Sequence, residues 1–147
     1  MLRTSWRSGA AHDAEPPFVV SATRFVYRRR RYLPLVSYHA WRLRRSWISR
    51  QGAVGLLTGA ETLRPVTYSV SVWAREEDLR RFLRAPEHVR LMRDFRARLV
   101  ESKSVTWSVD RVVPEDAWRE ALRRLNDLLD ARTPGTLRSQ GADALEP

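Results

Sequence analysis

A strictly alternating run in the middle of the chain limits its fold more than any other feature. In residues 66–73, VTYSVSVW, three valines and a tyrosine alternate with a threonine, two serines and a tryptophan. Because successive side chains of a β-strand point to opposite faces of a sheet, this run predicts a strand with one apolar face and one face of small polar residues. The small polar face ends on Trp73, and small residues beside a large ring leave room.

Periodic segments on both sides of this strand predict the rest of the fold. Further strands are expected over residues 17–27, 52–61 and 102–113, and helices over residues 32–49, from residue 76 onward and over residues 115–130. The helix after Trp73 begins at three acidic residues and should break near residues 84–86, where Pro86 fits the first turn of a new segment. The order β-α-β-β-α-β with a C-terminal helix is the ferredoxin-like arrangement of an α+β protein, with helices on one face of an antiparallel sheet.

The chain length and this pattern predict one domain that pairs with a second copy. We predict a disordered N-terminal arm over residues 1–16, a single ferredoxin-like domain over residues 17–131 and a disordered C-terminal tail over residues 132–147. Helices on one face would leave the other face of the sheet uncovered, although Val and Trp recur at alternate positions there. A second subunit is the natural cover, so we predict a homodimer of the dimeric α+β barrel type.

What the sequence lacks excludes several classes of protein and site. The chain has no cysteine, which excludes disulfides and thiolate metal ligands, and no histidine pair at metal-ligand spacing, so no metal site is predicted. It also has no glycine-rich phosphate loop. No run of about 18 apolar residues is present to span a membrane, and the first residues lack the apolar core of a signal peptide, so we expect a cytoplasmic protein.

A family resemblance rests on residues 69–88, SVSVWAREEDLRRFLRAPEH. A strand ends on Trp73, an acidic helix start follows, and Phe82 precedes His88 with five residues between them. This segment resembles the third strand and second helix of the dimeric α+β barrel superfamily, in particular spheroidene monooxygenase and the DUF3291 proteins. It is more distantly similar to the antibiotic biosynthesis monooxygenase domains. The resemblance implies the fold and the dimer, and its members include cofactor-free oxygenases, haem-dependent oxygenases and isomerases.

The resemblance leaves the cofactor open between none and haem. Haem-degrading relatives usually carry their haem-ligating histidine further along the second helix, at a place that corresponds to Met92 here. Haem degradation is therefore not expected, and a bound haem would need His88 or His39 as its ligand.

His88 is the candidate catalytic residue. In the first turn of its helical segment it shares a stripe with Leu91, Met92 and Phe95, so it should face inward. The positive end of a helix disfavours imidazolium, so a neutral imidazole is expected near pH 7, suited to hydrogen bonding or general base chemistry. The alternative is a buried histidine that bonds to a backbone carbonyl and only packs.

Four further residues are candidates for substrate binding. Trp73 stands on the small polar strand face, and Arg24 lies inside an otherwise apolar strand, where a charge must reach solvent, an acid or a ligand. His39 occupies the inner stripe of the first helix, where plain packing is the alternative, and Tyr68 completes the set. The structure should place Trp73 and Arg24 close enough to His88 to share a ligand.

Three functions remain open from the sequence. The first is a monooxygenase-like enzyme that acts on a hydrophobic or aromatic small molecule held between sheet and helices. The second is a non-catalytic protein that binds a small molecule or haem on the same fold. The third follows from the net charge of +10, which would suit a nucleic-acid-associated protein, although a solvated arginine surface explains the charge equally well.

Overall fold

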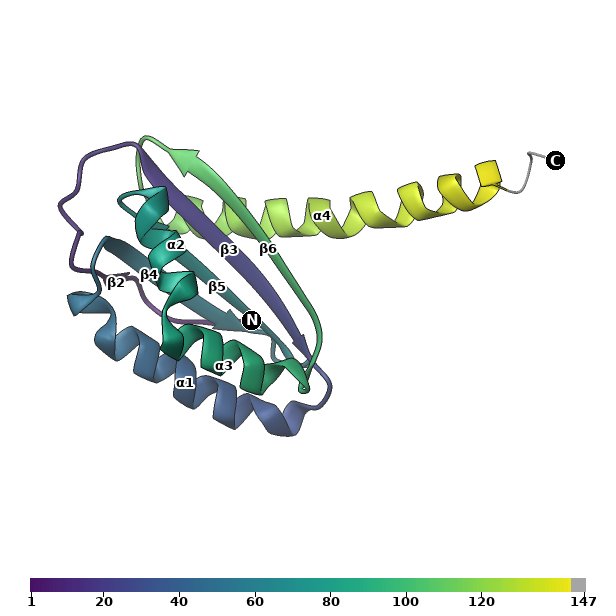
Figure 1. Cartoon of the computed structure of the whole chain (residues 1–147), viewed down its shortest axis with the longest axis horizontal. Coiled ribbons are helices and arrows are strands. Elements are labelled where there is room, and N and C mark those ends of the chain that lie inside the picture. The colour runs from purple at the N-terminus through teal and green to yellow at the C-terminus, as the bar shows by residue number, and fades with distance from the viewer. Residues whose placement is uncertain (144–147) are drawn as a thin grey trace.

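The chain folds into an antiparallel sheet with helices packed on both of its faces (Figure 1). This computed structural model describes residues 1–143, with side chains described through residue 131. The strands are β1 (Leu2–Arg3), β2 (Arg7–Ser8), β3 (Phe18–Tyr27), β4 (Ala53–Ala60), β5 (Val66–Trp73) and β6 (Leu99–Val109). The helices are α1 (Leu33–Ser46), α2 (Glu76–Arg84), α3 (Pro86–Arg96) and α4 (Pro114–Asp143), with short 3-10 turns η1 (Arg30–Tyr32) and η2 (Trp47–Ser49) around α1.

The sheet has the ferredoxin-like topology that the sequence predicts. The four long strands lie in the order β4-β5-β3-β6, and every pairing is antiparallel. In this order the first and third strands of the β-α-β-β-α-β unit are central and the second and fourth are at the edges. The fold class, α+β with a ferredoxin-like core, is therefore confirmed.

The register of β3 and β5 sorts side chains onto two chemically different faces. Ala22 pairs with Val70 on the apolar face, while Ser21 pairs with Ser71 on the small polar face. The apolar face packs on α4 and forms the larger core, which includes Trp118, Ala121 and Leu125 of that helix. The two-residue period of β5 is thus the pattern that divides the molecule into layers.

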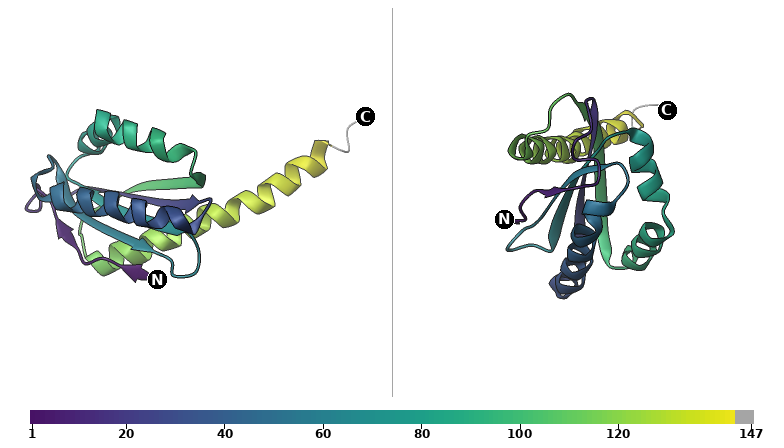
Figure 2. Two further views of the ribbon diagram at one scale, coloured as in Figure 1. Left: turned by 90° about the horizontal axis from the view of Figure 1, so that it is seen from below. Right: turned by 90° about the vertical axis from the view of Figure 1, so that its left-hand side faces the viewer.

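Helix α4 occupies the sheet face that the sequence analysis assigned to a second subunit. Figure 2 shows α4 on one side of the sheet and α1, α2 and α3 on the other. The expectation of helices on one face only is therefore wrong, because the apolar stripe of α4 folds back on its own sheet. The homodimer stays a prediction, and its first reason, an open apolar sheet face, is weakened.

The break between the two central helices lies where the sequence places it. Helix α2 ends at Arg84, Ala85 takes extended angles (φ −58°, ψ 135°), and α3 begins at Pro86. Proline lacks the N–H that a continuous helix would need at this point, so a new first turn is the favourable solution. This break redirects the chain and positions His88 in the first turn of α3.

The N-terminal arm differs from the disordered segment predicted over residues 1–16. Strands β1 and β2 both pair with the outer edge of β4. Arg3 forms an ion pair with Glu115 at the start of α4, and Arg44 of α1 donates to Thr4 Oγ1 (3.0 Å) and to the Ser5 carbonyl oxygen (2.8 Å). The arm is therefore fixed to three elements, which a composition-based expectation of disorder could not anticipate.

The predicted disordered tail covers residues 132–143, which continue helix α4 and whose side chains are not described, and residues 144–147, which lie outside the described residues. Among the described residues, no helix combines the length and apolar character needed to cross a membrane.

The contact between Trp6 and Gly55 tests whether the arm is docked. A Cβ on Gly55 would lie 1.7 Å from Trp6 Cζ2, so Gly55→Ala must displace the indole ring. We expect Trp6→Ala and Gly55→Ala each to lower the free energy of unfolding by about 1–3 kcal/mol in urea titrations. In a Trp6→Ala background the Gly55→Ala change should cost much less, because the clash is gone. Additive effects would show that the arm does not pack on β4.

Candidate functional site

A cavity of about 1220 Å³ lies between the small polar face of the sheet and the helices α1, α2 and α3. Its floor consists of short side chains and one ring at alternate positions of the three strands β3, β4 and β5: Ser21, Thr23, Phe25, Thr58, Thr67, Ser69 and Ser71. The short side chains of this face therefore leave room above the sheet. A volume of this size accommodates a molecule with several rings.

Helix α1 covers this cavity loosely. None of its residues is buried, and the lining side chains Tyr38 and Trp41 are 51% and 53% exposed. Arg42 stacks over the Tyr38 ring at 6.0 Å and Arg45 over the Trp41 ring at 5.4 Å. The cavity is therefore a groove with an aromatic and cationic rim, and a ligand could reach its floor along α1.

His88 lies on the wall of this groove. Its ring is half-buried, and the ring centroid is 4.8 Å from that of Phe82. Burial lowers the pKa of His88 below the ordinary value, the nearby charge of Arg50 lowers it further, and the Leu83 carbonyl acts in the opposite direction as a hydrogen-bond acceptor. The imidazole is therefore neutral at pH 7, with one nitrogen turned to Leu83.

The Phe82 ring, which contacts the ring of His88, packs against a cluster of two tryptophans. Its ring centroid lies 5.2 Å from that of Trp73 and 6.0 Å from that of Trp47, and these two tryptophans are in edge contact at 5.1 Å. Trp73 is completely buried, its Nε1 donates to Ser71 Oγ at 2.9 Å, and it does not line the groove. The predicted ligand contact by Trp73 is therefore absent from this structure, where the residue supports the wall.

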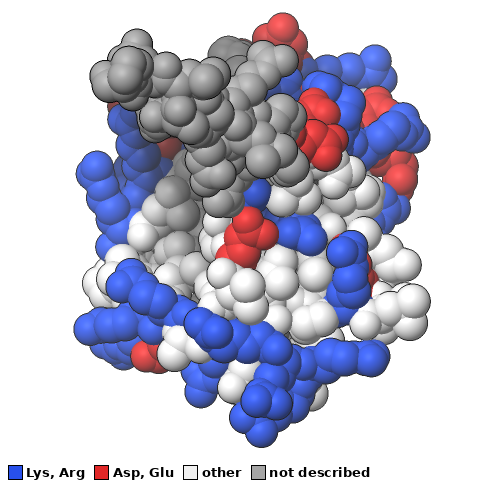
Figure 3. All heavy atoms as spheres, turned by 90° about the vertical axis from the view of Figure 1, so that its right-hand side faces the viewer, with Lys and Arg blue, Asp and Glu red and all other residues white. Residues whose placement is uncertain are grey.

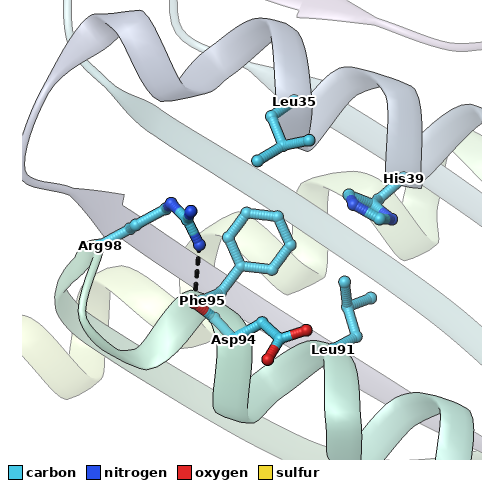
Figure 4. Close-up of a pocket in the computed structure, with 6 residues that line it drawn as sticks. All are labelled: Leu35, His39, Leu91, Asp94, Phe95 and Arg98. Atoms are coloured by element: carbon cyan, nitrogen blue, oxygen red, sulfur yellow. Dashed lines mark hydrogen bonds between the residues drawn. The ribbon is translucent and has the colours of Figure 1, made fainter.

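His39 lies toward the other end of the same groove. It also lines a smaller pocket of about 310 Å³ between α1 and α3, where its ring meets that of Phe95 at 5.4 Å and 90° (Figure 4). Arg98 closes this pocket and donates to the Asp94 carbonyl oxygen at 2.7 Å. The structure thus brings His39 and His88 to one groove, on different helices.

Arg24 and the side chain of Tyr68 lie on the other face of the sheet. The register that pairs them turns both side chains to the α4 face of the sheet, where Arg24 Nε donates to Tyr68 Oη at 3.4 Å. Arg24 pairs with Glu101 at 3.5 Å, and Tyr68 donates to Glu61 Oε1 at 2.9 Å. Tyr68 is nevertheless among the residues that line the groove, because β5 forms part of its floor. The expectation that Arg24 shares a ligand with Trp73 and His88 is wrong, because Arg24 alternates with Ser21 and Thr23.

Arg50 is the residue that sequence reasoning missed. It follows η2, lines the groove, and holds its guanidinium carbon 4.8 Å from the centroid of Phe82, on the ring that also carries His88. Among so many arginines nothing in the sequence distinguishes it. The described residues contain no cluster of three or more His, Asp or Glu that could hold a metal ion.

Comparison with known proteins identifies the fold but no family. No family model and no curated protein matches the sequence. Among solved structures, SnoaB, a cofactor-independent oxygenase from Streptomyces nogalater, has a TM-score of 0.52 and 19% identity over 67% of this chain and 99% of its own. A dimeric ferredoxin-like protein of unknown function from Thermobifida fusca has a TM-score of 0.54 and 13% identity over 65% and 94%.

A third similar structure is a proposed monooxygenase from Lactobacillus acidophilus NCFM, with a TM-score of 0.54, 15% identity and 65% of this chain aligned. This chain spans 46% of that longer protein. At such identities the likeness concerns the fold alone, which is ferredoxin-like.

The electrostatic coupling of Arg50 and His88 gives a prediction for NMR. The imidazole of His88 should titrate below its ordinary pKa of 6.5, and Arg50→Gln should raise the midpoint because a nearby positive charge is removed. Arg93→Gln, an exposed change on α3, is the charge-matched control and should leave the midpoint unchanged. An equal titration midpoint of His88 in the wild type and both variants would show that the charge of Arg50 does not act on His88.

Proposed function

We propose that the protein is a monooxygenase-like enzyme that oxidises a hydrophobic or aromatic small molecule in the groove between sheet and helices. The observation that supports it most strongly is a half-buried His88, whose pKa is lowered by burial, beside a cavity of about 1220 Å³ with a hydroxyl-lined floor. Similar folds that include a cofactor-independent oxygenase are consistent with this reading. The proposal assigns His88 the role of general base.

The chemistry follows from the groups at hand. A neutral imidazole accepts a proton from an acidic ring C–H or phenol of the substrate and leaves an electron-rich anion. Such an anion can reduce O₂ directly. For a ring methylene the overall reaction is CH₂ + O₂ → C=O + H₂O, so the substrate supplies all the electrons and one oxygen atom enters it. The serine and threonine hydroxyls of the floor would hydrogen-bond the substrate oxygens, and Phe82 would offer a stacking surface.

Oxygen uptake with anthrone, an aromatic ketone with an acidic ring methylene, tests this function. His88→Gln should lower kcat by about 10²-fold or more while circular dichroism stays unchanged, because the general base is lost. The wild-type rate should fall at acidic pH with a midpoint below 6.5, as the imidazole becomes protonated. His39→Gln is the matched control in the same groove and should change KM rather than kcat. Equal kcat in His88→Gln and wild type would show that His88 is not the general base and only packs in the wall of the groove.

Haem binding in the same groove is the alternative function. An axial imidazole needs one free nitrogen and an acceptor for the other, and His88 beside the Leu83 carbonyl meets this requirement. The arginines of the rim suit carboxylate side chains of such a group. A bound haem would supply redox chemistry, while the chain would supply the ligand and these ion pairs. A Soret band that depends on His88 after addition of hemin would favour this alternative.

The basic surface keeps a nucleic-acid-associated role as a second alternative. Arginines 28–31 are exposed between β3 and α1, and Figure 3 shows Lys and Arg gathered along the lower edge of one face. Binding that rests on phosphate neutralisation alone falls steeply with salt and does not distinguish sequences. The groove supports the small-molecule function instead, because phosphate contacts require no cavity.

The homodimer remains part of the proposal. Edge strand β6 is long, and its Val100 is 63% exposed, which leaves a surface for a second copy beside the α4-covered face. A dimeric protein of similar fold is consistent with this. Light scattering should give twice the chain mass of 17.2 kDa.

A further inference from the structure

The groove is lined by arginines that form no salt bridge with a described carboxylate. Four arginines line it, namely Arg42, Arg45, Arg50 and Arg90. Among residues 1–131, whose side chains the structure describes, the salt bridges involve none of the four. Three of them are exposed and so remain hydrated, whereas Arg50 is half-buried.

Arg50 is poorly satisfied by the protein itself. Its Nε is buried without a hydrogen-bond partner, and its one side-chain bond, from Nη2 to Ser46 Oγ, is long at 3.4 Å. A buried N–H without an acceptor costs free energy, so an acceptor that reached the guanidinium would stabilise this arrangement. The groove that Arg50 lines is the place from which a partner could come.

The position of Arg50 also suits a bound anion geometrically. Its guanidinium lies against Phe82 at 4.8 Å and against Trp47 at 6.0 Å from the ring centroids. Contact with rings restrains the guanidinium plane, and the N–H groups at its edge form the fork that binds carboxylate or sulfonate oxygens. The acids of the groove, Glu87 and Asp94, are exposed residues of α3 and form no described salt bridge with Arg50.

We propose that Arg50 binds the acidic group of the groove's ligand, which makes that ligand an aromatic acid. Its ring system would lie over the small polar floor near Phe82, and its carboxylate or sulfonate would pair with the guanidinium. His88, on the same Phe82 ring, would then face an atom of the ligand close to this anchor. The inference rests on the groove being the ligand site proposed above.

Two fluorescent probes of one skeleton separate the acidic group from the rings. Anilinonaphthalene sulfonate carries an anion, and N-phenylnaphthylamine is its neutral parent. The wild-type protein should bind both. Arg50→Gln should weaken binding of the sulfonate about tenfold or more and leave the neutral probe within about twofold, because only the charge-assisted hydrogen bonds are lost. Arg93→Gln, which removes an exposed charge outside the groove, should alter neither affinity.

The outcomes distinguish this inference from the function on which it rests. Equal sulfonate affinity in wild type and Arg50→Gln, or equal losses in Arg50→Gln and Arg93→Gln, would overturn the inference and leave the groove as a ligand site. Failure of the neutral probe to bind the wild type would overturn both proposals. If Arg50→Gln does not fold, Arg50→Lys keeps the charge and the aliphatic stem, and its sulfonate affinity should still fall severalfold relative to the neutral probe. An unchanged ratio would contradict the inference.

Discussion

The two-residue period of β3 and β5 is the constraint on which the rest of the structure depends. The large side chains of the apolar face of these strands lie under α4. The serines and threonines of the small polar face lie under α1 and α3. A well-packed core then forms on one side, while the other side keeps space. A shift of one residue in this register would exchange the two faces and remove both the core and the groove.

The tryptophan cluster converts this space into a defined site. Trp47 of η2 and Trp73 at the end of β5 are both fully buried, and both contact Phe82 of α2. Phe82 in turn contacts the ring of His88 and the guanidinium of Arg50. A neutral base and a cation are thus held on one rigid aromatic support at the end of a groove whose remaining cover, α1, is loosely packed.

The sequence predicts the elements well and their partners less well. Strict alternation and the Pro86 break are local signals, so the strands, the start of α3 and the inward direction of His88 follow from them. The face chosen by α4 and the docking of residues 1–16 depend on tertiary contacts such as Trp6 on Gly55, for which no local pattern exists. Arg50 could not be predicted for the same reason. Its buried Nε without a hydrogen-bond partner results from tertiary contacts and not from its neighbours in sequence.

Amide NMR shifts on addition of the neutral probe N-phenylnaphthylamine test the central claim most directly, that the groove between sheet and helices is the ligand site. Chemical shifts should change most at the floor residues Thr23, Ser69 and Ser71 and along α1 and α3. Changes confined to the α4 face, around Val105 and Trp107, would contradict the account.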